Sequence, residues 1–369
     1  MTEMSRPTDA PRPLATTVIG SWPVPEWLAR LKTEWFRGRI SHAQMQDVHE
    51  TAIKAALRDQ ELAGIDIVSD GELRRDNDVD YLLSRMPGVE IAQTAKDFYF
   101  DYYEPRVTAP LGDADGPLGL ADDYAFTAAQ TDRPITVSLT GPFSLAHRIR
   151  DEAYGDRRAL VLAVARRLNA EAAELAARGA TRLQLDEPFL AGYPDQVGVA
   201  VEAINLVTAD VDVSWGLHVC YGNRYARPSW EGHYDFLFPA VLEARVDHLV
   251  LEFARKGFDD LPALARYGWD RSVGVGVIDV KSPRVETPDL VAARIRHALR
   301  YVPAERLVLN PDCGLRHLSG AVARAKLAAL VAGAAQVRES LVETSAPPPP
   351  EPSPTPSEPA PALAQGAAT

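Results

Sequence analysis

The sequence contains little cysteine, no long apolar run and no excess of positive charge. Two cysteines among 369 residues cannot build a disulfide framework, which is typical of a protein from a reducing cytoplasm. The net charge of −12 argues against a nucleic-acid or anionic-membrane partner, since both need concentrated lysine and arginine. The chain has no run of about 18 apolar residues and no apolar N-terminal signal segment, so we expect a cytoplasmic protein without a membrane span.

Both ends of the chain are poor in large apolar side chains. Residues 343–369 are rich in proline, serine and alanine, and residues 1–14 are similar in character. Such segments cannot bury enough apolar surface to offset the entropy lost on ordering. We therefore expect disorder at both ends and one folded domain over residues 15–342. A proline-rich tail that docks on a partner is the alternative for the C-terminal segment.

Between the ends, short β-branched runs alternate with segments of helical period, and each run is bounded by glycine, proline or aspartate. The predicted strands are residues 16–21, 65–72, 135–142, 182–188, 213–220, 248–253, 272–279 and 306–314. Eight strands with helices between them indicate an α/β protein with a single (β/α)8 TIM barrel. A doubly wound sheet is the alternative, but GVGV at 274–277 lacks the third glycine and the downstream acid of a dinucleotide-binding turn.

Residues 86–134 do not follow this alternation. They contain the aromatic stretch KDFYFDYYEPRV and several glycines and prolines. We predict an insertion after the second βα unit that lies near the barrel mouth as a hairpin cover. Its aromatic side chains could line a substrate pocket or pack the hairpin against the barrel, and packing is the favoured interpretation.

Polar residues gather at the predicted carboxyl ends of the strands, where barrel enzymes place their chemistry. In chain order they are Ser21, Asp70, Glu72, Thr140, Asp186, Glu187, His218, Cys220, Glu252, Asp279, Lys281, Asp312 and Cys313. Few of these residue types favour stability at such positions. Together they predict a polar barrel mouth that is able to bind a metal.

The stretch HVCYGN places His218 and Cys220 two residues apart, and alternate residues of a strand point to the same face. The other cysteine, Cys313, lies at the end of the last predicted strand. Glu252 lies at the end of the strand that follows His218 and Cys220 along the chain. An imidazole, two sulfurs and a carboxylate form a ligand set suited to Zn²⁺. The alternative for a lone His-x-Cys pair is chance, with the cysteine as a buried apolar residue.

Zinc that carries two thiolates is a poor activator of water but binds a further thiol and deprotonates it. A free thiol has a pKa of about 8.5 and is mostly protonated at neutral pH. A zinc site of this composition therefore indicates activation of a thiol for alkyl transfer.

These motifs resemble the cobalamin-independent methionine synthase family over roughly residues 15–342. The matching stretches are TTVIGSWP, DGELRRD, LTGP, LDEP, HVC, LEF and NPDCGL, and the chain is similar to the short, core members of the family. The resemblance implies zinc held by His218, Cys220, Glu252 and Cys313. It also implies an amino-acid thiol bound by Ile19, Gly20, Ser21, Glu72 and Asp186, with Lys281 and Asp186 as candidate catalytic residues.

For the thiol substrate, the residues agree with the resemblance, because two carboxylates can hold an ammonium while Ser21 and backbone N–H groups take a carboxylate. The alternative for Glu72 and Asp186 is strand-end capping, or an ion pair with Arg74 or Arg75.

Three positions depart from the family pattern. Lys281 stands where the family has a histidine thought to protonate the methyl donor, Arg148 where a tryptophan stacks on the pterin, and Gly192 where an acid holds the pterin. A lysine could serve as an acid there only with a lowered pKa, or could instead bind a substrate anion. We therefore leave the donor open between methyltetrahydrofolate and a corrinoid carrier.

Three functional hypotheses follow. The first is a zinc-dependent S-methyltransferase that makes methionine from homocysteine. The second is another thiol alkyltransferase of the same superfamily, such as an epoxide–coenzyme M transferase, in which Lys281 and Arg148 face a sulfonate. The third is a non-enzymatic binding protein that recruits a partner through its proline-rich tail.

Overall fold

The computed structural model describes residues 12–91, 98–112 and 118–345. The disorder predicted for residues 1–11 and 346–369 lies outside the described residues. The adjoining positions are more ordered than predicted, because Leu14 is fully buried and the last helix continues to Ser345.

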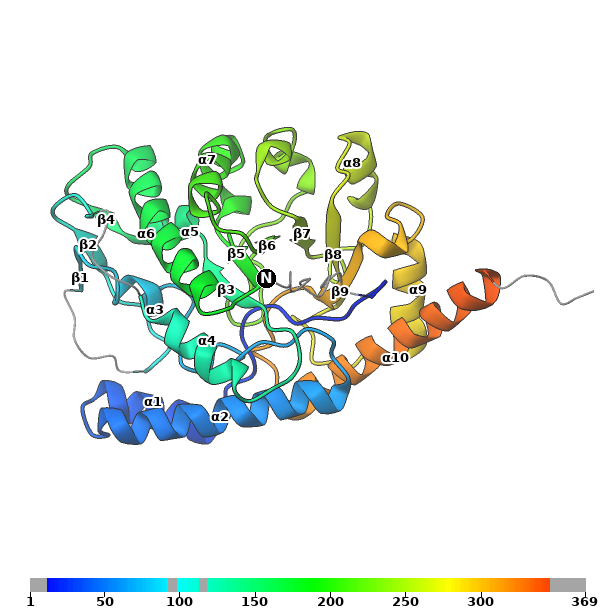
Figure 1. Ribbon diagram of the computed structural model, residues 1–369, viewed down its shortest axis with the longest axis horizontal. Helices are drawn as coiled ribbons and strands as arrows, with labels where there is room; N and C mark the ends of the chain where they lie inside the picture. Colours follow the sequence, from blue (N-terminus) through cyan, green and yellow to red (C-terminus); the bar gives the residue numbers. More distant parts are fainter. Residues whose placement is uncertain (1–11, 92–97, 113–117, 346–369) are drawn as a thin grey trace, which may run out of the picture.

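A parallel sheet of six strands lies at the centre of the fold (Figure 1). Its strands follow in the order β3 (Val137–Thr140), β5 (Arg182–Asp186), β6 (Ser214–Val219), β7 (His248–Leu251), β8 (Ser272–Ile278) and β9 (Leu307–Pro311). Each lies within a predicted strand. These strands are rich in buried valine and leucine because a parallel sheet is covered on both faces. Since all six run in the same direction, their carboxyl ends meet on one side of the sheet.

The first two predicted strands are shorter than expected. Residues 16–21 and 65–72 contribute only isolated parallel bridges, which join Thr16 to Leu309, Thr17 to Ile67 and Val68 to Ile135. Both segments thus lie between β9 and β3. Each then leaves the extended conformation, at Gly20 with φ 51° in the first and at Gly71 with φ 67° in the second. The prediction of full strands was therefore wrong for these two segments.

Helices surround the central strands (Figure 1). They are α1 (Glu26–Phe36), α2 (His42–Ala63), α3 (Asp80–Leu83), α4 (Leu120–Ala128), α5 (Pro142–Arg148), α6 (Arg157–Ala177), α7 (Val197–Val207), α8 (Leu261–Arg266), α9 (Pro288–Ala298) and α10 (Gly320–Ser345). Short 3-10 segments are η1 (Leu190–Gly192), η2 (Pro194–Gln196), η3 (Tyr234–Leu237), η4 (Ala240–Glu243) and η5 (Ala304–Arg306). α6 starts where the Asp156 side chain accepts a hydrogen bond from the N–H of Arg158, and Gly179 follows its end at φ 94°.

The residues predicted as an insertion form a small sheet outside the central one. β1 (Val89–Ile91) pairs antiparallel with β2 (Pro105–Val107), and β2 pairs parallel with β4 (Arg150–Asp151). The aromatic stretch follows the part of the hairpin that is not described, and Tyr99, Phe100 and Tyr103 within it are buried. The insertion therefore packs against the body of the protein, as favoured from the sequence, and its residues Phe100 and Tyr102 also line a cavity, which was the alternative.

Within the described residues, one helical segment, Gly320–Val342 of α10, is long and apolar enough to cross a membrane by length and composition. It packs against α9 and α2, and Leu327 and Leu330 are fully buried. The Lys326 ammonium within it is also buried and lies 2.8 Å from the Glu286 carboxylate. The apolar face of α10 is therefore explained by its packing against the rest of the protein.

Candidate metal centre and active site

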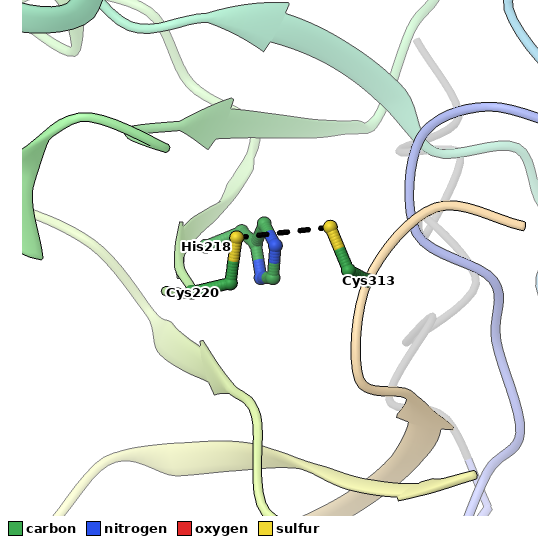
Figure 2. Close-up of side chains that lie close together, drawn as sticks. All are labelled: His218, Cys220 and Cys313. Carbon is green, nitrogen blue, oxygen red and sulfur yellow. Dashed lines mark hydrogen bonds between the residues drawn. The ribbon is translucent and has the colours of Figure 1, made fainter. Parts of the chain in front are cut away.

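His218, Cys220 and Cys313 come together at the carboxyl ends of the strands (Figure 2). His218 and Cys220 come from the end of β6, and Cys313 from the loop after β9. Their ligand atoms all lie within 4.8 Å of one another, and the two sulfurs are 3.7 Å apart. This confirms that the two cysteines of the chain meet beside the histidine.

The geometry of this cluster fits a tetrahedral metal. The 3.7 Å between the sulfurs is too long for a disulfide, which has a length of about 2.05 Å. Two sulfurs on one tetrahedral zinc, each about 2.3 Å from the ion, would lie about 3.8 Å apart. His218 Nδ1 is 3.0 Å from the carbonyl oxygen of Val250, while its Nε2 is buried without a hydrogen bond. Metal-bound histidines are typically held through the other ring nitrogen in this way.

The electrostatics of the cluster also favour a cation. Contact with Cys220 and burial raise the pKa of the Cys313 thiol well above its usual value. Burial alone would lower the pKa of His218, but the nearby Cys313 and Asp186 raise it to about 9. Burial beside Cys220 thus disfavours a thiolate at Cys313, while Cys313 and Asp186 favour a positive charge at His218. A metal ion can supply that charge in place of the protons.

The structure does not bring Glu252 into this cluster. Its fully buried carboxylate accepts a hydrogen bond from Arg255 Nε at 2.6 Å and another from Lys281 Nζ at 2.9 Å. The backbone N–H of Tyr221 is a third donor at 3.3 Å. Two cations thus hold the carboxylate away from the sulfurs, and a ligand role for Glu252 stays a prediction.

Lys281 is placed behind the cluster rather than in a position to meet a substrate. Its side chain is 4% exposed and is absent from the walls of the adjoining cavity. Burial alone would lower the pKa of Lys281, but Cys313 and Glu252 raise it. A proton donor to the methyl group's carrier would need a lowered pKa. In this structure Lys281 is the partner of Glu252, and a role as a catalytic acid stays a prediction.

A cavity of about 300 Å³ opens beside the cluster. All the residues predicted to bind the thiol substrate line it, together with the three members of the cluster: Ile19, Gly20, Ser21, Glu72, Asp186, His218, Cys220 and Cys313. These side chains come from segments up to about 300 residues apart in sequence, and the parallel arrangement of the strands brings them to one place.

The carboxylates of Glu72, which is buried, and Asp186, which is partly buried, lie on the wall of this cavity. Burial raises the pKa of Glu72 to about 7, although Arg75 lies 3.0 Å away and opposes the shift. The predicted alternative of an ion pair with Arg75 is therefore correct in geometry. Burial also raises the pKa of Asp186, which accepts a hydrogen bond from Gln184 Nε2 at 2.7 Å. A bound ammonium would stabilise the charged form of both.

Gly192, where the family has an acid, lies under an aromatic side chain that the sequence did not indicate. A Cβ atom at this position would fall 2.3 Å from the ring of Trp230, so only glycine fits. Trp230 lines the cavity and contacts Phe189 with ring centroids 5.6 Å apart. No sequence pattern indicated the contact between Gly192 and Trp230, because the two residues lie outside the strands and α-helices.

Two strand-end carboxylates outside the predicted site hold its scaffold. Asp312 accepts hydrogen bonds from the N–H groups of residues 253–255 at 2.8–2.9 Å, and a Cβ at Gly276 would fall 2.1 Å from its Oδ1. Glu187 accepts the N–H groups that start α5, and a Cβ at Gly141 would fall 2.1 Å from its Oε1. These contacts explain the second glycine of GVGV and the glycine of LTGP.

Comparison with known proteins agrees with this site. Residues 14–336 match the family described as "Cobalamin-independent synthase, Catalytic domain". The chain is 35% identical to a methionine synthase of Saccharolobus islandicus over 329 residues, covering 89% of this chain and 96% of the relative. It is 36% identical to a methionine synthase of Thermococcus kodakarensis over 338 residues, covering 90% and 97% respectively.

Solved structures give the same result. A B12-independent methionine synthase from Shewanella sp. W3-18-1, solved in complex with selenomethionine, is 31% identical, with a TM-score of 0.79 and coverage of 90% of this chain and 99% of that one. A protein from Listeria monocytogenes described as a vitamin-B12-independent methionine synthase is 21% identical with a TM-score of 0.69, which bears on the fold alone. The chain therefore belongs to the cobalamin-independent methionine synthase family, a family of methyltransferases.

Proposed function

We propose that the protein is a zinc-dependent S-methyltransferase that converts homocysteine to methionine. The observation that carries the proposal is the cluster of His218, Cys220 and Cys313, whose sulfurs lie 3.7 Å apart on the wall of a cavity lined with buried carboxylates. A thiol entering this cavity reaches the cluster directly.

His218, Cys220 and Cys313 would hold the zinc, and Glu252 stays available as a fourth ligand if it leaves Lys281. Bound there, zinc would supply a positive charge that lowers the pKa of an incoming thiol and keeps it as a nucleophilic thiolate. The carbonyl oxygen of Val250 fixes the His218 ring by accepting a hydrogen bond from Nδ1, so that Nε2 would bind the metal once its own proton has left.

The walls of the cavity suit the amino-acid part of homocysteine. Glu72 and Asp186 would hold the ammonium between two carboxylates, while Ser21 and the backbone at Ile19–Gly20 take the carboxylate group. Gly20 shapes this segment through its φ of 51°, a backbone conformation that other residues rarely adopt. The Shewanella relative was solved with selenomethionine, which carries the same ammonium and carboxylate groups.

The two carboxylates also weigh against a coenzyme M-type substrate, because they would face an anionic thiol that has no ammonium.

We further propose that residues 16–21 and 65–72 complete a (β/α)8 barrel with the six strands, within one domain over residues 15–342. The bridges of Thr16 to Leu309 and of Val68 to Ile135 support closure. We place the enzyme in the cytoplasm, with either a methylated folate or a corrinoid carrier as the donor.

Metal analysis tests this proposal directly. We expect one zinc per chain, and sulfur coordination that increases when homocysteine is added, as seen by zinc-edge X-ray absorption. Cys313→Ser should lose zinc and methionine formation while keeping the fold by circular dichroism. Ser229→Ala, a cavity-wall change away from the cluster, is the control and should keep zinc. A Cys313→Ser variant with full zinc content and activity would exclude the proposed metal centre.

A further inference from the structure

Three arginines line the cavity away from the metal cluster. Arg148 ends α5, Arg224 lies in the loop after β6, and Arg316 follows β9. Within the described parts of the chain, none of the three forms an ion pair, although Asp and Glu outnumber Lys and Arg by 51 to 39. Arg316 donates to the backbone oxygen of Asp76 at 3.0 Å, and its charge lowers the pKa of the Glu72 carboxyl. Three guanidinium groups without a salt bridge in the described structure are a feature that folding alone does not require.

Tyr102 holds two of these cations together. Its ring centroid is 4.6 Å from Arg148 Cζ and 4.9 Å from Arg224 Cζ. Its hydroxyl donates a hydrogen bond to Asp78 Oδ1 at 2.7 Å. This bond fixes the ring and uses one oxygen of the Asp78 carboxylate. Phe100, from the same insertion, lies under Arg316 with its ring centroid 5.2 Å from Cζ. Aromatic faces thus position the guanidinium groups without neutralising them.

Arg148 also has an unmet hydrogen-bonding group. Its Nε is buried and has no acceptor within the described structure, although an N–H of a guanidinium is a strong donor. Buried donors of this kind are normally satisfied, and a planar anion can meet two guanidinium N–H groups at once. The site therefore has the donors, the charge and the flat surfaces that an anionic ligand uses.

Charged groups of both signs line the cavity. The buried end, beside the metal cluster, carries Glu72 and Asp186, whereas Arg224 is exposed to solvent. An amino-acid thiol at the buried end would have its carboxylate near Ser21. An anion at the arginines is thus a different group, on a second ligand that reaches the thiol from the open side.

We propose that Arg148, Arg224 and Arg316 bind an anionic group, a carboxylate or a phosphate, of the methyl donor. The identity of the ligand as a donor rests on the proposed methyl transfer, whereas its charge rests on the arginines alone. Arg148 and Gly192 stand where the resemblance placed the pterin contacts. The donor is therefore selected here by its charge and by contact with Tyr102 and Phe100.

Calorimetric titration of the full-length zinc-loaded protein tests this inference with two pairs of probes. 5-Methyltetrahydrofolate with three glutamates is compared with the monoglutamate, and methylcobalamin with methylcobinamide, which lacks the nucleotide phosphate. The variants are Arg148→Gln, Arg224→Gln and the double variant. Arg227→Gln is the matched control, because Arg227 is exposed in the same loop but does not line the cavity.

We expect the more anionic member of one pair to bind wild type, and each arginine variant to weaken it by about tenfold, since a charge-assisted hydrogen bond is lost. Arg227→Gln should change affinity by less than about twofold, as surface charges do. A loss specific to the triglutamate identifies carboxylates, and one specific to methylcobalamin identifies the phosphate. Equal affinity of the double variant and wild type, or no binding of any probe at millimolar concentration, overturns the inference.

Zinc content and homocysteine binding, measured on the same samples, separate this inference from the proposed function. A protein that binds zinc and homocysteine but none of the four probes refutes the anion site and leaves thiol activation standing. A protein that lacks zinc but binds a probe through the two arginines keeps the anion site and refutes the zinc-dependent function.

Discussion

Replacing Lys281 with methionine tests the charge arrangement behind the metal cluster. The Lys281 ammonium and the Glu252 carboxylate are 2.9 Å apart, with side chains 4% and 0% exposed. Removing one partner of a buried ion pair costs about 3–5 kcal/mol, because the other charge is left without compensation. Arg255 still holds the second carboxylate oxygen at 2.6 Å, so we expect a loss near the lower end, about 3 kcal/mol.

A double-mutant cycle isolates the pair. Glu252→Gln alone leaves the Lys281 ammonium buried and unpaired, so it should also cost about 3 kcal/mol. The double variant removes both charges, and we expect it to be about 2–3 kcal/mol more stable than the sum of the single changes predicts. The assay is urea unfolding of protein treated with a chelator, so that bound metal does not contribute.

The control uses another buried lysine. Lys326 lies on α10, and its Nζ is 2.8 Å from Glu286 Oε2. Lys326→Met breaks this ion pair, which involves neither Lys281 nor Glu252. Its cost should add to that of Glu252→Gln within about 0.5 kcal/mol. If Lys281→Met and Glu252→Gln are additive to the same degree, Lys281 does not hold Glu252, and the reasoning about this site is refuted.

Two further predictions concern stability. Gly276→Ala should lower the free energy of unfolding by at least about 3 kcal/mol, because the added Cβ would lie 2.1 Å from Asp312 Oδ1. The control is Gly198→Ala, where nothing lies within 4 Å of the added Cβ, and it should be neutral or stabilising by up to about 1 kcal/mol. Urea titrations measure both changes. Burial and Lys32 lower the pKa of His49 to about 2, so the unfolded chain gains this proton below about pH 6.5 and the folded chain does not. The free energy of unfolding should thus decrease as the pH is lowered. Between pH 7 and pH 5 the wild type should lose about 2 kcal/mol more of it than His49→Phe. Equal losses would show that His49 is protonated in the folded protein.

The sequence predicted the six central strands because their pattern follows from burial. A strand such as SVGVGVI in β8 is covered on both faces, so its apolar residues run without alternation and stop at the polar mouth. The segments that begin at Thr16 and Ile65 have the same composition. Their loss of strand geometry depends on the positive φ of Gly20 and of Glu72, which adjoin each other at the cavity and are set by tertiary contacts.

The metal cluster was predictable for a different reason. His218 and Cys220 share a strand face, and parallel strands bring their carboxyl ends to one side, so a second strand-end cysteine had to lie near them. The commitment of Glu252 to Lys281 was not predictable, because it depends on side-chain geometry between β7 and the loop after β8. Tyr102 comes from a segment without periodicity, so its position against Arg148 also left no pattern.

The strand-end carboxylates fall into two groups that the sequence treats alike. Asp312 and Glu187 accept hydrogen bonds from backbone N–H groups and press against a glycine on a neighbouring segment, so they are consumed by the scaffold. Glu72 and Asp186 receive their hydrogen bonds from side chains and face the cavity. Burial raises the pKa of all four carboxyl groups, so the pKa does not separate the two groups. A carboxylate that backbone donors do not satisfy retains lone pairs for a ligand. The division between structural and substrate-binding acids is therefore decided by where the neighbouring backbone N–H groups point, which only the folded chain determines.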